Sequence, residues 1–230
     1  MKTEETVVIS VGGSLIVPGA IDISFLKKLK TFIETETANG RRFIIIAGGG
    51  RTARNYQEAA GAVAALAADD LDWMGIHATR LNGHLLRTIF RELAHKVMIT
   101  NPDDILDVPA EEKVIIAAGY RPGSSTDLRA VQIASRVGAS KVINLSNIDY
   151  VYTADPRENP AAEKITTISW ADFRALIPKD WDPGLSSPFD PIAAKAADEQ
   201  SIEVAIINGG ALEEIGNYLH DRPFTGTKIS

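Results

Sequence analysis

The sequence contains no cysteine, so disulfide bonds, thiolate nucleophiles and cysteine-based zinc sites are excluded from its chemistry. No apolar run approaches the roughly 18 residues that a membrane-spanning helix requires. The N-terminus carries acidic Glu4 and Glu5, where a signal peptide would carry positive charge. We therefore expect a cytoplasmic protein with no membrane partner.

Basic residues are too few to give a surplus that could neutralise a nucleic-acid backbone, since the formal net charge is -6 at pH 7. Polymeric nucleic acid is thus not an expected partner, although a local basic pocket could hold a small anion. The Gly-Lys-Ser or Gly-Lys-Thr of a Walker loop is missing. The glycine clusters at residues 12–13 and 48–50 do not fit the three spaced glycines of dinucleotide-binding proteins. An NAD enzyme is correspondingly disfavoured.

The chain has 230 residues and 45% hydrophobic content, which is enough for one sizeable core. Short β-branched runs alternate with helical patterns, which predicts βαβ units around a mostly parallel sheet. No linker or repeat interrupts the chain, so we predict a single domain over residues 1–230. The expected strands are 7–11, 43–47, 114–117, 142–145 and 204–207, and the expected helices are 24–37, 52–67, 73–94, 128–137, 191–200 and 212–219.

Glycine clusters follow the first two expected strands, Gly-Gly-Ser at 12–14 and a triple glycine at 48–50. Glycine at the carboxyl end of a strand lets backbone N–H groups approach an anion, and the next helix N-terminus adds a favourable dipole. The alternative is a pair of tight strand-to-helix turns, but two such clusters together favour phosphate binding. Arg54 can point its guanidinium back towards the anion, whereas Arg51 is equally well explained as a solvated surface charge.

Several segments resemble motifs of the amino-acid-kinase family, and of its archaeal-type uridylate kinases in particular. Residues 8–14 (VISVGGS) resemble the opening phosphate-binding motif, and residues 48–56 (GGGRTARNY) resemble the second glycine motif. Residues 72–82 (DWMGIHATRLN) are similar to the helix start whose aspartate accepts the ribose hydroxyls of UMP. Residues 119–127 (GYRPGSSTD) are similar to the loop that closes over the uracil, with serine for its first threonine.

The C-terminal part continues the resemblance. Residues 146–156 (SNIDYVYTADP) resemble the loop that holds the adenine and ribose of ATP, and residues 186–195 (SSPFDPIAAK) resemble the helix start that bears a catalytic-site aspartate. Residues 226–229 (GTKI) are similar to the closing Gly-Thr strand. The resemblance implies a three-layer αβα sandwich with a central mostly parallel sheet, with an acceptor-binding lobe at about 1–139 and an ATP-binding lobe at about 140–230.

Individual roles follow from the same motif matches. The implied ATP-binding residues are Gly12, Gly13, Ser14, Gly50, Arg54, Ser146, Asn147, Tyr152 and Asp155. The implied UMP-binding residues are Gly49, Asp72, Gly119, Tyr120, Arg121, Pro122, Gly123, Ser124, Ser125 and Thr126. The implied catalytic residues are Asp190, Arg54 and Ser14, with Mg²⁺ brought by ATP rather than held in a dedicated protein site.

Two aspartates of these motifs have ordinary structural alternatives to substrate contact. Asp72 could serve merely as a helix cap, and Asp127 could be a first-turn carboxylate favoured by the helix dipole. Two further positions depart from the family pattern. Ser10 stands where many family members have a lysine, and Tyr150 replaces a glycine, whose backbone a bulky residue adopts less easily if φ is positive. The lysines that could compensate for Ser10 are Lys195, Lys164 and Lys228.

The resemblance implies ATP-dependent phosphorylation of UMP to UDP in pyrimidine nucleotide synthesis. Another small-molecule kinase of the same family is an alternative, as is a catalytically idle nucleotide-binding regulator. A third possibility is a structural oligomer that uses the 73–94 helix as an interface. The family usually assembles as hexamers, so we expect a homo-oligomer that binds ATP and UMP.

Overall fold

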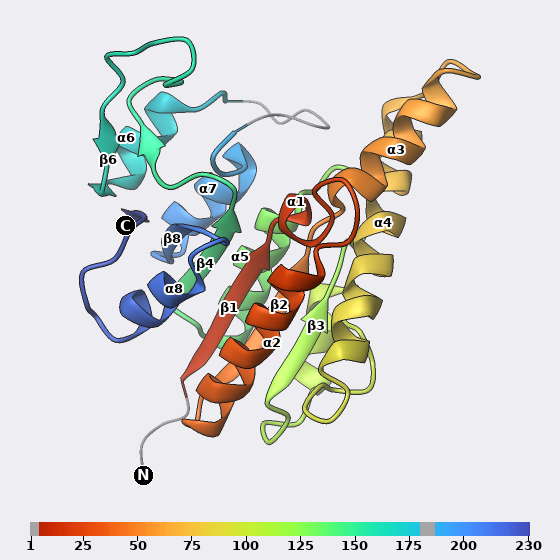
Figure 1. Cartoon of the computed structure of the whole chain (residues 1–230), viewed down its shortest axis with the longest axis vertical. Helices are drawn as coiled ribbons and strands as arrows, with labels where there is room; N and C mark the ends of the chain where they lie inside the picture. Colours follow the sequence, from red (N-terminus) through yellow and green to blue (C-terminus); the bar gives the residue numbers. More distant parts are fainter. Residues whose placement is uncertain (1–4, 180–186) are drawn as a thin grey trace.

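The computed structural model describes residues 5–179 and 187–230, which form a central seven-stranded sheet with helices on both faces (Figure 1). The strand order is β3-β2-β1-β4-β8-β9-β7, and a separate β5-β6 hairpin carries two further strands. The strands are β1 (Thr6–Val11), β2 (Arg42–Ala47), β3 (Val114–Ala117), β4 (Lys141–Ser146), β5 (Val151–Tyr152), β6 (Lys164–Ile165), β7 (Thr167–Ile168), β8 (Glu203–Asn208) and β9 (Thr227–Ile229).

The sheet is parallel except where β9 runs antiparallel to β8. Val11 pairs with both Ala47 and Leu145, so β1, β2 and β4 end at the same edge of the sheet. Consequently the segments that follow these strands meet at one place, although they are far apart in sequence.

The helices are α1 (Gly13–Ile16), α2 (Ile23–Ala38), α3 (Gly50–Gly61), α4 (Ala68–Ile89), α5 (Thr126–Val137), α6 (Trp170–Leu176), α7 (Pro191–Glu199) and α8 (Leu212–Leu219), with a 3-10 helix η1 (Pro102–Asp107). Alternate strand residues face opposite sides, so Ile44 and Val142 pack with α5 and α7, whereas Ile45 and Ile143 pack with α2, α4 and α8. The sandwich therefore has three layers, and Figure 1 shows α2 and α8 in front of the sheet with α5 behind it.

The termini of the helices explain where several of them begin. Asp22, Ser125 and Asp190 are N-cap residues whose side chains accept backbone N–H groups at the starts of α2, α5 and α7. Pro191 occupies the first turn of α7, where its missing N–H costs no helical hydrogen bond. At the other end of α5, Gly138 adopts the left-handed conformation (φ 67°) that stops a helix.

Two expected helices have the wrong bounds. The 52–67 segment is helical only to Gly61, because residues 62–65 lie exposed with no core to bury them. The helix expected at 73–94 spans Ala68–Ile89. At its start Asp70 accepts the Ala67 N–H, and beyond its end Ala94 forms a β-bridge with Val114 of β3. The short elements α1, η1, β5, β6, β7 and α6 were not predicted. Nowhere in 5–179 or 187–230 is there a helix long and apolar enough to cross a membrane.

The turns after β1 and β2 pack backbone against backbone. A Cβ atom added to Gly13 would lie 1.9 Å from the Gly50 backbone nitrogen, and one added to Gly48 would lie 2.3 Å from the Gly13 nitrogen. Gly50 also has a positive φ of 61°. Since no side chain fits between the turns, glycine here is required by close approach as well as by conformation.

We predict that Gly13→Ala lowers the free energy of unfolding by about 3 kcal/mol, because the added methyl group must push the two turns apart. Gly19→Ala is the matched control, since a Cβ atom at Gly19 meets nothing within 4 Å. Its effect should stay within about 0.5 kcal/mol. Urea unfolding of both variants measures the difference, and equal midpoints would show that the turns are not in contact.

Candidate functional site

The candidate site lies at the carboxyl edge of the sheet, where five parallel strands end. The 12–14 turn follows β1, the 48–50 turn follows β2, and the 119–126 segment, here named the acceptor loop, follows β3. The segment 146–157 follows β4, and Asp190 begins α7. The fold therefore brings nearly all the predicted site residues to one edge.

Helix α4 holds two of these segments through side chains on its inward face. Asn82 is 3% exposed, and its Nδ2 donates to the Gly48 and Gly49 carbonyl oxygens at 2.8 and 3.1 Å. The Thr79 hydroxyl accepts the Gly119 N–H at 2.8 Å. Arg80 donates through Nε to the Gly119 carbonyl and through a terminal nitrogen to the Tyr120 carbonyl, at 3.1 and 3.0 Å.

Asp72 lies inside α4, not at its start, so the interpretation of this residue as a helix cap is wrong. The helix begins at Ala68, and Asp70 supplies the hydrogen bond to its N-terminus. The Asp72 Oδ2 atom instead accepts the Gly123 N–H at 2.7 Å. Two predicted UMP contacts, Asp72 and the acceptor loop, are thereby in direct contact.

Within the acceptor loop, two serines already have local partners. The Ser124 hydroxyl donates to the Arg121 carbonyl at 3.1 Å and accepts a hydrogen bond from Arg129 at 2.7 Å. The Ser125 hydroxyl accepts the Leu128 N–H at 3.1 Å as the N-cap of α5. Ser124 therefore stabilises the loop. The Ser125 hydroxyl lies against the Asp190 carboxylate, whereas Thr126 still has a hydroxyl hydrogen to donate.

The arginines of α3 differ from each other. Arg51 forms an ion pair with Glu58 at 2.9 Å, which fits the surface-charge interpretation. Arg54 is exposed and has no hydrogen bond or ion pair with any described residue, so its guanidinium is available to an anion at the 48–50 turn.

A cleft of about 500 Å³ lies beside β4 and contains all four predicted adenosine contacts, Ser146, Asn147, Tyr152 and Asp155. Leu176, Ile177 and Pro178 line its other wall. Hydrogen bonds from Arg157 lower the pKa of Asp155 to about 2, so this carboxylate is charged and already partnered.

The Tyr150 backbone explains why tyrosine is tolerated where the family pattern has glycine. Among the described residues, only Ser201 and Asp221 combine a side chain with positive φ, so Tyr150 adopts an ordinary conformation. Its ring meets the Tyr152 ring edge-on, at 6.5 Å between centroids. The substitution adds an aromatic wall to the cleft without backbone strain.

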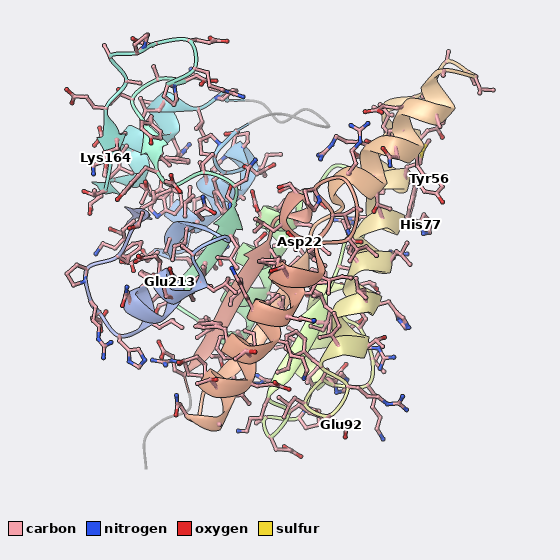
Figure 2. All side chains as sticks on the ribbon, viewed as in Figure 1. Asp22, Tyr56, His77, Glu92, Lys164 and Glu213 are labelled. Atoms are coloured by element: carbon pink, nitrogen blue, oxygen red, sulfur yellow. The ribbon has the colours of Figure 1, made fainter. Side chains whose placement is uncertain are left out.

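The three lysines proposed to compensate for Ser10 have other partners. Lys195 lies 3.8 Å from Glu199, and Lys228 lies 3.5 Å from Glu203. Lys164 stands over the Tyr150 ring, 5.0 Å from its centroid. Figure 2 shows Lys164 beside β6, on the opposite side of the view from Tyr56 and His77 of α3 and α4. None of these contacts includes Asp127 or Asp190.

Ser10, Asp127 and Asp190 form a buried polar cluster that the sequence did not reveal as a unit. The Ser10 hydroxyl donates to Asp127 Oδ1 at 3.0 Å, and the Asp190 N–H donates to Asp127 Oδ2 at 3.3 Å. Asp190 Oδ1 accepts the Ala193 N–H at 2.7 Å, while Oδ2 is buried with no hydrogen bond. Within 5–179 and 187–230, no lysine or arginine forms an ion pair with either carboxylate.

Burial and like charge both act on these carboxylates. Burial raises the pKa of Asp127 to about 6, and repulsion from Asp190 adds to the rise, while the Ser10 hydroxyl opposes it. Burial also raises the pKa of Asp190, against the opposing effects of the Ala193 N–H and the nearby Ser125 hydroxyl. The pair of carboxylates therefore favours a cation bound beside it.

The donor set fits Mg²⁺ that arrives with ATP. No group of three or more histidine, cysteine or acid side chains in the described residues could hold a metal on its own. Mg²⁺ is commonly held by one or two carboxylates together with substrate phosphates, and Asp190 offers an unpartnered oxygen for that purpose. Asp190 and Asp127 are the residues that would face the ion.

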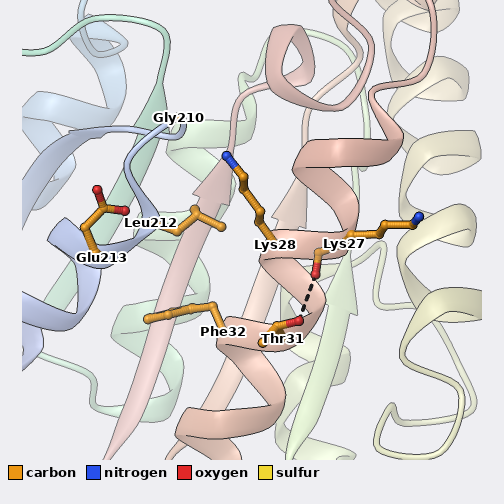
Figure 3. Close-up of a pocket in the computed structure, with 7 residues that line it drawn as sticks. All are labelled: Lys27, Lys28, Thr31, Phe32, Gly210, Leu212 and Glu213. Carbon is orange, nitrogen blue, oxygen red and sulfur yellow. Dashed lines mark hydrogen bonds between the residues drawn. The ribbon is translucent and has the colours of Figure 1, made fainter.

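A second hollow, of about 450 Å³, lies between α2 and α8 (Figure 3). Its one polar contact among the residues drawn joins the Thr31 hydroxyl to the Lys27 carbonyl at 3.2 Å. Its lining contains none of the predicted site residues, and we assign it no role: Lys27, Lys28, Thr31, Phe32, Gly210, Leu212 and Glu213.

Together, the mostly parallel sheet, the glycine turns at adjacent strand ends and the paired carboxylates define an α/β protein that binds phosphorylated ligands. A family model described as "Amino acid kinase family" matches residues 5–208. The chain therefore belongs to the amino acid kinase family, as the motifs predicted, and its three-layer fold is confirmed.

Relatives of this chain carry a more specific name. The uridylate kinase of Methanospirillum hungatei is 31% identical over 226 residues, which cover 98% of this chain and 94% of that protein. The uridylate kinase of Pyrococcus abyssi is 33% identical over 87% of this chain and 89% of that protein. The crystal structure of uridylate kinase from Archaeoglobus fulgidus superposes with a TM-score of 0.80 at 26% identity, covering 97% of this chain and 99% of that one.

We predict that Asp127→Asn stabilises the protein above pH 6 by about 3 kcal/mol. The pKa of Asp127 rises from 3.8 to about 6 on folding, so the folded state holds the proton more tightly and stability is lost as pH rises through this window. Asparagine carries no charge and escapes this loss.

Urea unfolding at pH 4 and pH 8 tests the sign. The gain should be larger at pH 8, whereas Asp69→Asn, at an exposed position in the first turn of α4, should show no such difference. A gain that is the same at both pH values would mean that Asp127 is not buried in its charged form.

Proposed function

We propose that the chain transfers the terminal phosphoryl group of ATP to UMP, giving UDP. The observation that carries the proposal is the order of segments along the carboxyl edge. In the strand order β3-β2-β1-β4, the acceptor loop follows β3, the glycine turns follow β2 and β1, and the cleft follows β4. The acceptor loop and the cleft thus flank a pair of turns suited to phosphates. Relatives named uridylate kinase, aligned over most of the chain, support UMP as the acceptor.

In this proposal the lobe at about 1–139 binds UMP and the lobe at about 140–230 binds ATP. The adenosine lies in the cleft beside β4, and the 12–14 turn and Gly50 face the ATP phosphates. Gly49 faces the UMP phosphate, and Asp72 faces the ribose. Arg54, exposed and without a partner in the described residues, reaches the transferring group.

Recognition of the base falls to donors of the acceptor loop. Uracil offers two carbonyl oxygens and one N–H, so a reader needs mainly hydrogen-bond donors. Arg80 occupies the Gly119 and Tyr120 carbonyl oxygens, while the Thr126 hydroxyl remains able to donate. A loop that has its carbonyl oxygens occupied and a donor free favours uracil over cytosine, whose amino group is itself a donor.

Phosphoryl transfer depends on positioning and charge neutralisation more than on covalent chemistry from the protein. Mg²⁺ bound to ATP supplies the divalent charge that neutralises the phosphate oxygens. Asp190 presents its unpartnered Oδ2 atom towards that charge, and Asp127 is held beside it by Ser10. The pair positions cations; neither carboxylate is assigned as a general base.

We also propose a cytoplasmic homo-oligomer, a hexamer by family resemblance. Large apolar side chains on α3 and α4 support an interface there, since Tyr56 is 68% exposed and Leu81 is 64% exposed. Figure 2 shows Tyr56 of α3 and His77 of α4 on the side of these helices that faces away from the sheet.

We predict that UMP is phosphorylated at least tenfold more efficiently than CMP, AMP or GMP when each is supplied with ATP and Mg²⁺. The measurement is kcat/KM across this panel, because that ratio reports discrimination between substrates. Equal values would contradict the assignment of UMP. A protein that binds ATP and UMP but never yields UDP would favour the regulator alternative.

We predict that Asp190→Asn lowers kcat at least 100-fold, about 2.7 kcal/mol in the barrier, while the dissociation constants of ATP and UMP change little. Asparagine keeps an oxygen for the Ala193 N–H, so the cap of α7 is preserved.

Asp22→Asn is the matched control for this variant, since Asp22 caps α2 in the same manner. Its kcat should remain at the parental value. Turnover of the Asp190 variant at the parental rate would refute the proposed role of its charge.

A further inference from the structure

Arg129 is a buried arginine without a carboxylate partner. The residue is 4% exposed, and it lies in the second turn of α5, next to the acceptor loop. No acidic side chain in the described part of the chain forms an ion pair with it, and its Nε atom is buried with no hydrogen bond. Burying an unpaired charge is costly, so its place in the structure needs a reason.

The guanidinium remains charged at neutral pH. Burial, together with the nearby charges of Arg121 and Arg136, lowers the pKa of Arg129 to about 10. The positive charge is therefore present under any ordinary assay condition, at an unfavourable position. Folding alone would be served as well by an apolar side chain of similar length.

Its contacts with Ser124 and Tyr120 hold the acceptor loop to α5, whereas its contact with Gln132 lies within α5 and orients the guanidinium. One terminal nitrogen donates to the Ser124 hydroxyl at 2.7 Å, and the other donates to the Gln132 side-chain oxygen at 2.6 Å. The guanidinium carbon lies 5.3 Å from the centre of the Tyr120 ring, and Arg121 lies 5.6 Å from the same ring. Ser124 passes the contact on by donating to the Arg121 carbonyl.

The α4 side of the loop is fixed differently. There Thr79, Arg80 and Asp72 bind backbone atoms of Gly119, Tyr120 and Gly123. On the α5 side, Arg129 binds the loop through the side chains of Ser124 and Tyr120. The planar guanidinium of Arg129 makes a cation–π contact with Tyr120 and a charge-assisted hydrogen bond with Ser124 at the same time.

We propose that Arg129 is a positioning residue that holds the acceptor loop in the conformation that receives the acceptor base. The inference rests on the proposed function, because the loop is assigned there to UMP. Loss of the guanidinium releases Tyr120 and Ser124, so the loop opens more often and discriminates less between uracil and cytosine. Arg129 itself does not contact the reacting atoms.

The first test measures loop order without any nucleotide. Amide hydrogen exchange of a peptide covering residues 119–126 is compared between the parental protein, Arg129→Met and Arg136→Met. Arg136 lies on the same helix and forms an ion pair with Asp103, so it is the matched loss of an arginine. We expect exchange at least tenfold faster in Arg129→Met and unchanged in Arg136→Met. Unchanged exchange in Arg129→Met overturns the proposal.

The second test measures the consequence for the acceptor. Arg129→Met should raise the KM for UMP about tenfold and lower the preference for UMP over CMP, with the KM for ATP within about twofold of the parental value. Arg129→Lys keeps the charge but loses the fork, so its KM should fall in between. Faster exchange with unchanged UMP kinetics overturns the link to the base.

Two further outcomes separate this inference from the proposed function. Parental protein that does not phosphorylate UMP refutes the function, and the exchange experiment then decides the loop-ordering claim alone. If Arg129→Met does not fold, Tyr120→Leu removes the ring contact while leaving Arg129 in place. Tyr120→Leu should then speed exchange of the same peptide, and no change would overturn the proposal.

Discussion

The contact between the two glycine turns is the constraint on which the rest of the site depends. Gly13 and Gly50 approach so closely that a Cβ atom on either would lie about 2 Å from backbone atoms of the other. This close approach holds the ends of β1 and β2 together and places the starts of α1 and α3 side by side. It also places the two glycine turns at one end of the sheet, where two phosphate groups could meet.

Helix α4 extends this arrangement from two turns to the whole acceptor side. Asn82 binds the carbonyl oxygens of Gly48 and Gly49, and Asp72 binds the Gly123 N–H about three helical turns earlier. The helix thus fixes the distance between the triple glycine and the acceptor loop after β3. Because a helix is stiff over this length, a displacement of Asn82 also displaces Asp72. The helix therefore links the proposed phosphate end of the acceptor site to its base end.

The five long strands were predictable because buried β-branched runs leave a plain signal, and the motifs after them located the edge. The end of α3 was not predictable, because residues 62–67 have strong helix propensity but no core to pack against, and tertiary burial decides. Arg129 left no signal at all, since an arginine in an amphipathic helix is normally solvated. Ser10 was noticed only as a missing lysine, and its bond to Asp127 depends on a contact 117 residues away.

That bond changes the electrostatics of the site. A lysine at position 10 would place a permanent cation beneath Asp127; serine offers only a hydroxyl, so the two carboxylates keep their mutual repulsion in the folded protein. A rise in pKa from 3.8 to about 6 corresponds to about 3 kcal/mol at neutral pH. A cation bound beside the pair removes part of this penalty, so the unliganded protein is destabilised at the point where a metal–nucleotide complex would bind. Binding energy of the donor and stability of the fold are therefore coupled through the same two side chains.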